Sequence, residues 1–207
     1  MTTIDEIALQ LRDKVLAAPR AGKRRIVALA GAPASGKSTL ATHLAQVLCA
    51  AGCQTQVVPM DGFHLDNKIL AARGMMPRKG AVDTFDVNGL MSLVRRLGCD
   101  DGIYFPKFDR AHDISIACAA EIASDCDTII VEGNYLLLDA PVWRDLAAHW
   151  DLSIALKVPE PILLDRLVKR WQDHGLPLTL AKRRAEENDL INARVVIDKT
   201  ISADVWV

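Results

Sequence analysis

The sequence lacks the features of a histidine- or cysteine-ligated metal centre, a disulfide scaffold or a strongly charged partner site. Its cysteines are odd in number and form no CxxC pair, and no histidines stand at the spacing of metal ligands. We therefore expect free thiols, as in a protein of the reducing cytoplasm. The cysteines are Cys49, Cys53, Cys99, Cys118 and Cys126. The formal net charge of −1 gives no reason to expect nucleic acid or a membrane surface as a partner.

Long hydrophobic runs are also missing. No run approaches the ~18 apolar residues that a membrane span needs, and the acidic stretch Thr3–Asp13 is no signal-peptide core. We see no internal repeat and no low-complexity tract. The 207 residues suffice for one domain with a substantial core. These absences predict one cytoplasmic domain over residues 1–207.

Short apolar runs without polar alternation are present, and they alternate with helix-forming stretches. Such runs are typical of strands covered on both faces. The predicted strands are Ile26–Ala30, Gln54–Met60, Thr128–Val131, Leu152–Val158 and Ile201–Val207, with a small excursion of strands at Ile103–Phe108 and Ile114–Ala117. The predicted helices are Thr3–Ala18, Lys37–Ala50, Asn67–Arg73, Asp86–Leu97, Pro161–His174 and Leu180–Lys199, and Arg78–Phe85 is expected as a loop. This order predicts an α/β fold with a doubly wound, mainly parallel sheet flanked by helices.

The stretch after the first predicted strand matches the phosphate-binding pattern GxxxxGK[ST]. Glycines let the backbone wrap around phosphate oxygens, and the N–H groups and dipole of the following helix favour an anion. Lys37 supplies a cation for the outer phosphates, and the Ser38 hydroxyl can bind Mg²⁺. The predicted ATP-binding residues are Gly31, Ala32, Pro33, Ala34, Ser35, Gly36, Lys37, Ser38 and Thr39. This is the P-loop of a nucleoside triphosphate-binding protein.

An acid ends the buried strand Thr128–Val131. In P-loop proteins a neighbouring strand commonly ends in a carboxylate that holds Mg²⁺ or its waters. Glu132 stands at that position. We therefore predict a Mg²⁺ site formed by Ser38 and Glu132.

A second acid, Asp61, ends the strand that follows the P-loop helix. Right-handed crossover should bring this strand end beside the P-loop, at the ligand-binding edge of the sheet. A carboxylate there can accept the proton of an attacking alcohol or contact Mg²⁺. A GTPase switch would need a guanine-reading NKxD stretch, and Ile197–Thr200 is only a partial match. The sequence thus favours a kinase for a small alcohol over a switch or a motor.

Several stretches between Ile26 and Asn192 resemble the uridine kinase, pantothenate kinase and phosphoribulokinase group. Besides the P-loop they are Met60-Asp61-Gly62-Phe63-His64, Asp83-Thr84-Phe85-Asp86, Tyr104 to Arg110, and Val131-Glu132-Gly133. In detail the chain is most similar to the bacterial branch labelled fructose transport system kinase. The resemblance implies ATP and Mg²⁺ as cofactors and a small-molecule alcohol as acceptor, a fructose-like sugar or a nucleoside.

The resemblance also implies roles for individual residues. Asp61 matches the base or Mg²⁺ contact, and Glu132 matches the second acidic strand end. Phe63, His64, Asp83, Phe85 and Arg110 match positions on the acceptor side, together with Asp61 and Glu132. The chain departs from uridine kinases, which carry a tyrosine near the Asp61 stretch and His-Pro where this chain has Ala81-Val82. These departures weigh against uridine itself.

Two arginines are predicted to assist phosphoryl transfer. Arg166 and Arg170 are spaced i, i+4 and share one helical face, where they could stabilise developing charge. The resemblance implies that they clamp phosphate, and we expect a helical lid at about residues 165–195, whose charges are mixed in sign. The alternatives are a pantothenate-type or other metabolite kinase, a nucleoside monophosphate kinase, and a non-catalytic ATP-binding sensor. A homodimer is compatible with the sequence, which names no interface.

Overall fold

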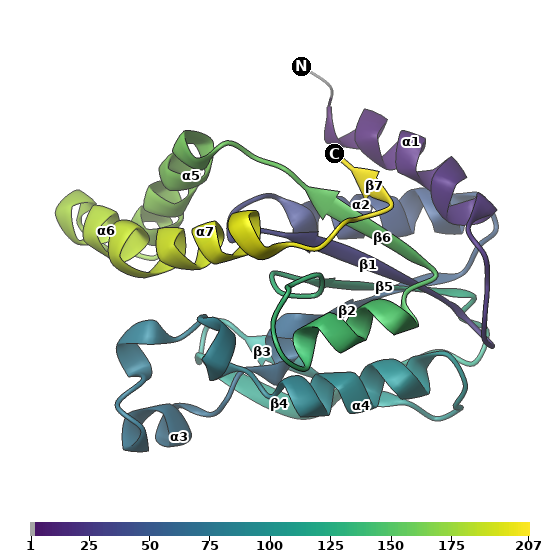
Figure 1. Cartoon of the computed structure of the whole chain (residues 1–207), viewed down its shortest axis with the longest axis horizontal. Helices are drawn as coiled ribbons and strands as arrows, with labels where there is room; N and C mark the ends of the chain where they lie inside the picture. Colours follow the sequence, from purple (N-terminus) through teal and green to yellow (C-terminus); the bar gives the residue numbers. More distant parts are fainter. Residues whose placement is uncertain (1–2) are drawn as a thin grey trace.

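The computed structural model describes residues 3–207 and has the predicted α/β architecture (Figure 1). In chain order the elements are α1 Ile4–Ala17, β1 Arg25–Gly31, α2 Lys37–Ala50, β2 Thr55–Pro59, α3 Asn67–Ala72, α4 Val87–Leu97, β3 Tyr104–Asp109, β4 Ile114–Glu121, β5 Thr128–Gly133, β6 Leu152–Leu156, α5 Glu160–Asp173, α6 Leu178–Arg184, α7 Leu190–Lys199 and β7 Val205–Trp206. Short 3₁₀ turns fill parts of the loops, among them Met60–Phe63 and Val82–Thr84. Within the described residues no helix combines the length and apolar character of a membrane-crossing segment.

The main sheet is parallel, with strand order β2-β5-β1-β6-β7. The prediction that β2 lies directly beside the P-loop strand was wrong, because β5 pairs with both β1 and β2. The crossover through α2 therefore passes over β5 and returns two strand positions from β1, about 10 Å away. The carboxyl ends of β1, β5 and β2 therefore follow one another along one edge, with Glu132 between the P-loop and Asp61.

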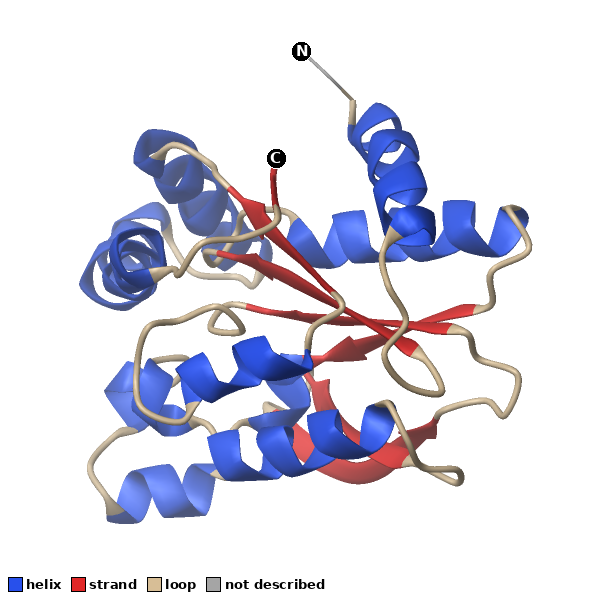
Figure 2. Cartoon of the chain, turned by 45° about the vertical axis from the view of Figure 1, so that its right-hand side comes forward, coloured by secondary structure: helices blue, strands red, loops and turns tan. Residues whose placement is uncertain are grey.

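Helices cover both faces of this sheet (Figure 2). On one face α1 and α2 pack against the inward side chains of β1, among them Val27 and Leu29. On the other face α4, α5 and α7 cover Ala28 and Val131. Burial on both faces explains why these strands show no polar alternation.

Capping residues fix the helix starts. The Thr3 hydroxyl accepts from the Glu6 N–H at 3.2 Å, and the Glu6 carboxylate accepts from the Thr3 N–H at 2.7 Å, forming a capping box. Asp66 caps α3 and Asp86 caps α4 through their carboxylates. The two short strands predicted at Ile103–Phe108 and Ile114–Ala117 form a separate antiparallel pair, β3 and β4.

The predicted C-terminal helix is not a single regular α-helix. A π-helical segment, Ala185–Asp189, separates α6 from α7. Such a segment changes which residues face a helix's neighbours, and it is frequent at functional sites. Here the Asn188 amide donates to the Lys79 carbonyl at 3.1 Å, and the Asp189 carboxylate accepts from the Trp171 indole at 2.5 Å. The helix pair α6–α7 is thereby tied to α5 and to the loop before α4.

Candidate active site

The P-loop follows β1 and leads directly into α2. Gly36 precedes the helix with φ at +95°, a left-handed conformation that favours glycine. A side chain at Gly31 would come within 2.7 Å of the Ser35 hydroxyl, so the loop closes tightly on itself. That hydroxyl is buried and has no hydrogen-bond partner within residues 3–207. A closed glycine-bearing turn with free polar groups at a helix N-terminus suits phosphate oxygens.

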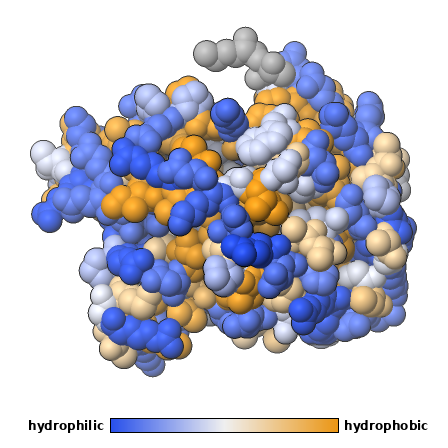
Figure 3. Space-filling model, in the orientation of Figure 1, coloured by the Kyte–Doolittle hydropathy of each residue, from blue (hydrophilic) through white to orange (hydrophobic). Residues whose placement is uncertain are grey.

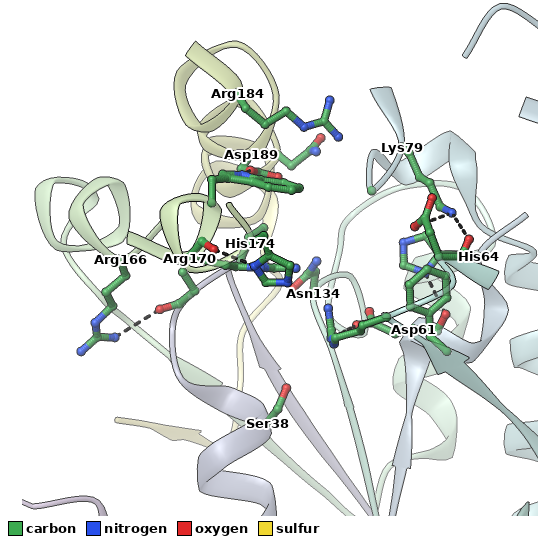
Figure 4. A pocket seen from close by; sticks show the side chains of 18 of the residues that line it. Ser38, Asp61, His64, Lys79, Asn134, Arg166, Arg170, His174, Arg184 and Asp189 are labelled. Atoms are coloured by element: carbon green, nitrogen blue, oxygen red, sulfur yellow. Dashed lines mark hydrogen bonds and ion pairs between the residues drawn. The ribbon is translucent and has the colours of Figure 1, made fainter. Parts of the chain in front are cut away.

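A cavity of about 640 Å³ opens in front of the P-loop (Figure 4). Its lining combines P-loop residues with residues of the β3–β4 hairpin, the loop before α4, and helices α5 to α7. The lining residues are Pro33, Ala34, Gly36, Lys37, Ser38, Asp61, His64, Met76, Lys79, Gly80, Phe108, Arg110, Asp113, Asn134, Arg166, Arg170, Trp171, His174, Arg184, Asp189 and Asn192. The cavity is large enough for a nucleotide's phosphates and a small second molecule.

Asp61 lies in the 3₁₀ turn that follows β2 and faces this cavity. A side chain at Gly62 would collide with the Pro106 carbonyl at 2.2 Å, so glycine lets β3 approach the turn closely. The Asp61 carboxylate forms an ion pair with Arg110 at 2.6 Å. Burial alone would raise the pKa of Asp61, but the positive charges of Lys37, His64 and Arg110 outweigh it and hold that pKa below its usual value. Asp61 is therefore ionised at neutral pH.

Lys37 and Glu132 form the deeper part of the site. Burial lowers the pKa of Lys37, although the charges of Glu132 and Asp61 oppose that shift. The Ser38 hydroxyl donates to the Glu132 carboxylate at 3.1 Å. Burial raises the pKa of Glu132, which is almost completely buried and does not itself line the cavity. The two oxygen groups predicted to hold Mg²⁺ are thus in direct contact, and Mg²⁺ commonly completes such a partial set with water.

The two arginines of α5 differ in what they contact. Arg166 donates hydrogen bonds to the carbonyls of Ala34 and Ser35, both at 3.2 Å. It is therefore bound to the main chain of the P-loop. Arg170 forms no ion pair within residues 3–207. Burial lowers its pKa, and the like charge of Arg110 lowers it further. Figure 4 shows Arg166 reaching away from Asp61, so the shared helical face does not give the two side chains the same environment.

Of the remaining predicted acceptor-side residues, only His64 lines the cavity. The His64 ring lies 4.1 Å from the Phe85 ring and 4.7 Å from the Phe108 ring, measured between centroids. Burial lowers the pKa of His64. Phe85 is buried and Phe63 half-buried, and neither lines the cavity. The Asp83 carboxylate also lies outside the cavity, in an exposed ion pair with Arg78 at 3.1 Å. Thr39 is exposed in the first turn of α2.

Sequence reasoning assigned several lining residues to the solvated surface or passed over them. They are Lys79, Asn134, Trp171, His174, Arg184, Asp189 and Asn192. Lys79 falls in the predicted loop Arg78–Phe85, yet its side chain is only 10% exposed and pairs with Asp113 at 2.9 Å. No motif or period marks these positions, because they come from separate loops and from a helix distorted by the π-helical segment. The clearest local signal near these positions is Gly80, next to Lys79. Its φ of +98° is a left-handed conformation that favours glycine.

Comparison with known proteins agrees with this geometry. The family model described as Phosphoribulokinase / Uridine kinase family matches residues 26–174. A crystal structure of a candidate fructose transport system kinase from Silicibacter sp. TM1040 has 49% sequence identity and a TM-score of 0.93, and the match covers 100% of both chains.

Two relatives cover most of the chain. The uncharacterised protein YggC of Escherichia coli K12 is 35% identical over 188 residues, which are 89% of this chain and 78% of the relative. A candidate uridine kinase of Schizosaccharomyces pombe is 33% identical over 196 residues, covering 88% and 82% of the two chains. With the P-loop in place and the family match spanning most of the sheet, the chain belongs to the phosphoribulokinase / uridine kinase family and is a P-loop kinase.

Proposed function

We propose that the protein transfers the terminal phosphoryl group of Mg²⁺-bound ATP to a hydroxyl group of a small molecule, a sugar or a nucleoside. The observation that carries the proposal is the position of Asp61. This ionised carboxylate faces the same cavity as Lys37 and Ser38 and is surrounded by cations. A carboxylate beside the phosphate-binding residues is what an alcohol acceptor requires.

The residues present fit a magnesium-bound triphosphate. The main chain from Gly31 to Thr39 and the Lys37 amine would hold the phosphates. Ser38 and Glu132, already 3.1 Å apart, would supply protein oxygens to the ion. The bound ion would neutralise charge on the phosphate oxygens during transfer.

Asp61 would receive the acceptor hydroxyl. As the new bond between the hydroxyl oxygen and phosphorus forms, the bond to the ADP oxygen breaks, and the hydroxyl proton passes to Asp61. Because the pKa of Asp61 lies below its usual value, its main contribution would be to orient the hydroxyl, with proton acceptance late in the step. When the acceptor hydroxyl binds the Asp61 carboxylate, Arg110 must either share that carboxylate with the hydroxyl or break its ion pair with Asp61.

The two α5 arginines would serve the phosphate end in different ways. Arg170, buried beside Arg110 and without an ion pair in the described residues, would face the transferring phosphoryl. Arg166, bonded to P-loop carbonyls, would hold the loop in shape. Residues 165–195 would act as a lid that excludes water.

The acceptor would lie between His64, Arg110 and the loop carrying Lys79. Phe63 and Phe85 would support the His64 side of this pocket by packing, and Asp83 would act through its Arg78 partner. The names of the Silicibacter and fission yeast relatives, a fructose transport system kinase and a uridine kinase, support a sugar or a nucleoside as the class to test.

A coupled ADP-release assay against a panel of sugars, nucleosides and pantothenate tests the proposal. We expect at least one alcohol to stimulate ADP release well above the rate with water alone, and Asp61→Asn to abolish that stimulation. Tight ATP binding with no stimulation by any alcohol would contradict the proposal and favour a nucleotide sensor.

A further inference from the structure

The cavity carries more positive than negative side chains. Three acids, Asp61, Asp113 and Asp189, line it. Six cations also line it: Lys37, Lys79, Arg110, Arg166, Arg170 and Arg184. A magnesium-bound nucleoside triphosphate brings about two net negative charges near neutral pH. Lining positive charge therefore remains when the nucleotide is in place.

Two of the acceptor-side cations, Lys79 and Arg110, already form an ion pair with a carboxylate. The Lys79 amine contacts the Asn67 side-chain oxygen at 2.6 Å and the Asp113 carbonyl and carboxylate, both at 2.9 Å, which uses all three of its donors. Arg110 is paired with Asp61 at 2.6 Å. The three cations of the P-loop and α5 lie at the phosphate end.

Arg184 is the acceptor-side cation that lacks a carboxylate partner. Its guanidinium donates one hydrogen bond, to the Pro77 carbonyl at 2.9 Å, and its central carbon lies 5.3 Å from the centroid of the Trp171 ring. Within residues 3–207 no carboxylate oxygen lies within 4 Å of it. The neighbouring Asp189 instead accepts from the Trp171 indole at 2.5 Å, and burial raises the pKa of that carboxyl. Arg184 is held in place with donors left over.

The position of Arg184 relates it to the transfer site. It stands at the end of α6, and its hydrogen bond to Pro77 holds it over the loop that carries Lys79. Figure 4 shows its guanidinium turned toward the Lys79 side, with Asp61 across the cavity. A molecule whose hydroxyl reaches Asp61 can therefore extend toward Arg184.

We infer that the acceptor carries an anionic group, a carboxylate or a phosphate, which Arg184 binds while Asp61 receives the hydroxyl. This inference rests on the proposed function and specifies the acceptor as an anionic alcohol, such as a sugar phosphate or a hydroxy acid. A guanidinium with free parallel donors is well matched to either anion, and a charge-assisted pair is shorter and stronger than a neutral one. An acceptor without an anionic group would leave the positive charge of the half-buried Arg184 side chain without a negative partner.

Calorimetric titration of the protein saturated with magnesium and a non-hydrolysable ATP analogue tests the inference. The probes are two matched pairs, ribose 5-phosphate with ribose and glycerate with glycerol. We expect the anionic member of at least one pair to bind tenfold or more tightly than its neutral partner. The phosphate and carboxylate pairs distinguish the two kinds of anion.

The variant Arg184→Gln should remove this preference, because glutamine can still donate to Pro77 but carries no charge. The matched control is Arg183→Gln. Arg183 is the preceding residue of the same helix, where it forms an exposed ion pair with Glu187, and the preference should survive its substitution. Equal affinity within both pairs, no binding of either anion, or a preference unchanged in Arg184→Gln would each overturn the inference.

The ADP-release assay separates this failure from failure of the proposed function. Phosphorylation of a neutral sugar or nucleoside, with no gain from an anionic group, would leave the proposed function intact and overturn only the anion site. Tight nucleotide binding without transfer to any alcohol, neutral or anionic, would contradict the proposed function itself.

Discussion

The two ends of the cavity are built in different ways. The phosphate end is centred on one continuous stretch, Gly31 to Thr39, whose main-chain N–H groups and one lysine would bind phosphate, with Glu132 and the two α5 arginines beside it. The acceptor end comes from side chains of the turn after β2, the β3–β4 hairpin, the loop before α4, and the helices α5 to α7. Main-chain recognition leaves a pattern in the sequence, whereas side chains assembled from distant segments leave none. The difference explains why the family and the phosphate donor are easier to identify than the acceptor.

The largest effect is expected at the phosphate end, from Lys37→Met. Removing this cation should lower turnover by about 10³-fold, because it stabilises charge on the transferring group in a site sheltered from water. Burial already lowers the pKa of Lys37, so the apolar replacement should not lower the melting temperature. Steady-state kinetics with a thermal melt measures both. Turnover within tenfold of the wild type would show that the main chain alone suffices.

The next effect concerns Asp61, where the two ends meet. Asp61→Asn should reduce turnover ~10²-fold or more and leave nucleotide affinity nearly unchanged, because the carboxylate serves the acceptor. Isothermal titration with an ATP analogue, paired with kinetics, separates the two quantities. If nucleotide affinity falls as much as turnover, Asp61 acts at the phosphate end of the cavity, as expected of a residue that contacts Mg²⁺ and not the acceptor.

The pH dependence of turnover gives a subtler comparison. The pKa of Asp61 lies below its usual value, so its protonation should limit turnover only in solution more acidic than the range in which an ordinary aspartate titrates. Arg110→Gln removes one of the cations that depress this pKa. The acidic limb of the kcat profile should therefore move to higher pH.

Lys107→Gln is the matched control for Arg110, since Lys107 lies on the same hairpin but does not line the cavity. Its profile should coincide with that of the wild type. An Arg110→Gln profile with an unshifted acidic limb would mean that the ion pair with Asp61 does not govern the titration.

The smallest effect is expected from Asp83→Asn. The resemblance assigns this residue to the acceptor side, but its carboxylate lies in an exposed pair with Arg78, and such pairs contribute little. We expect kcat/KM to change by less than about fivefold. A much larger loss in acceptor kinetics would mean that the loop around Asp83 closes onto the acceptor during the reaction.

The sequence predicted the sheet strands and the P-loop well because each depends on local chemistry. Apolar runs marked β1 and β5, and the glycines of the P-loop marked the turn before α2. The C-terminal helix was less accurately predicted, since the π-helical segment Ala185–Asp189 has no propensity signal. The strand order was missed for a similar reason, because a right-handed crossover fixes the hand of the connection but not how many positions it passes over.

The sequence alone determined that this protein binds phosphate through a P-loop on a parallel sheet, because that recognition uses the backbone of consecutive residues. It also placed an acid at the carboxyl ends of two further strands, Asp61 after β2 and Glu132 in β5. Only the tertiary structure decided that Lys79 is buried against Asp113, that Arg166 and Arg170 face different surroundings, and that Arg184 reaches the cavity without a carboxylate. Those outcomes depend on which distant segments pack together, and no single stretch of the chain encodes that packing.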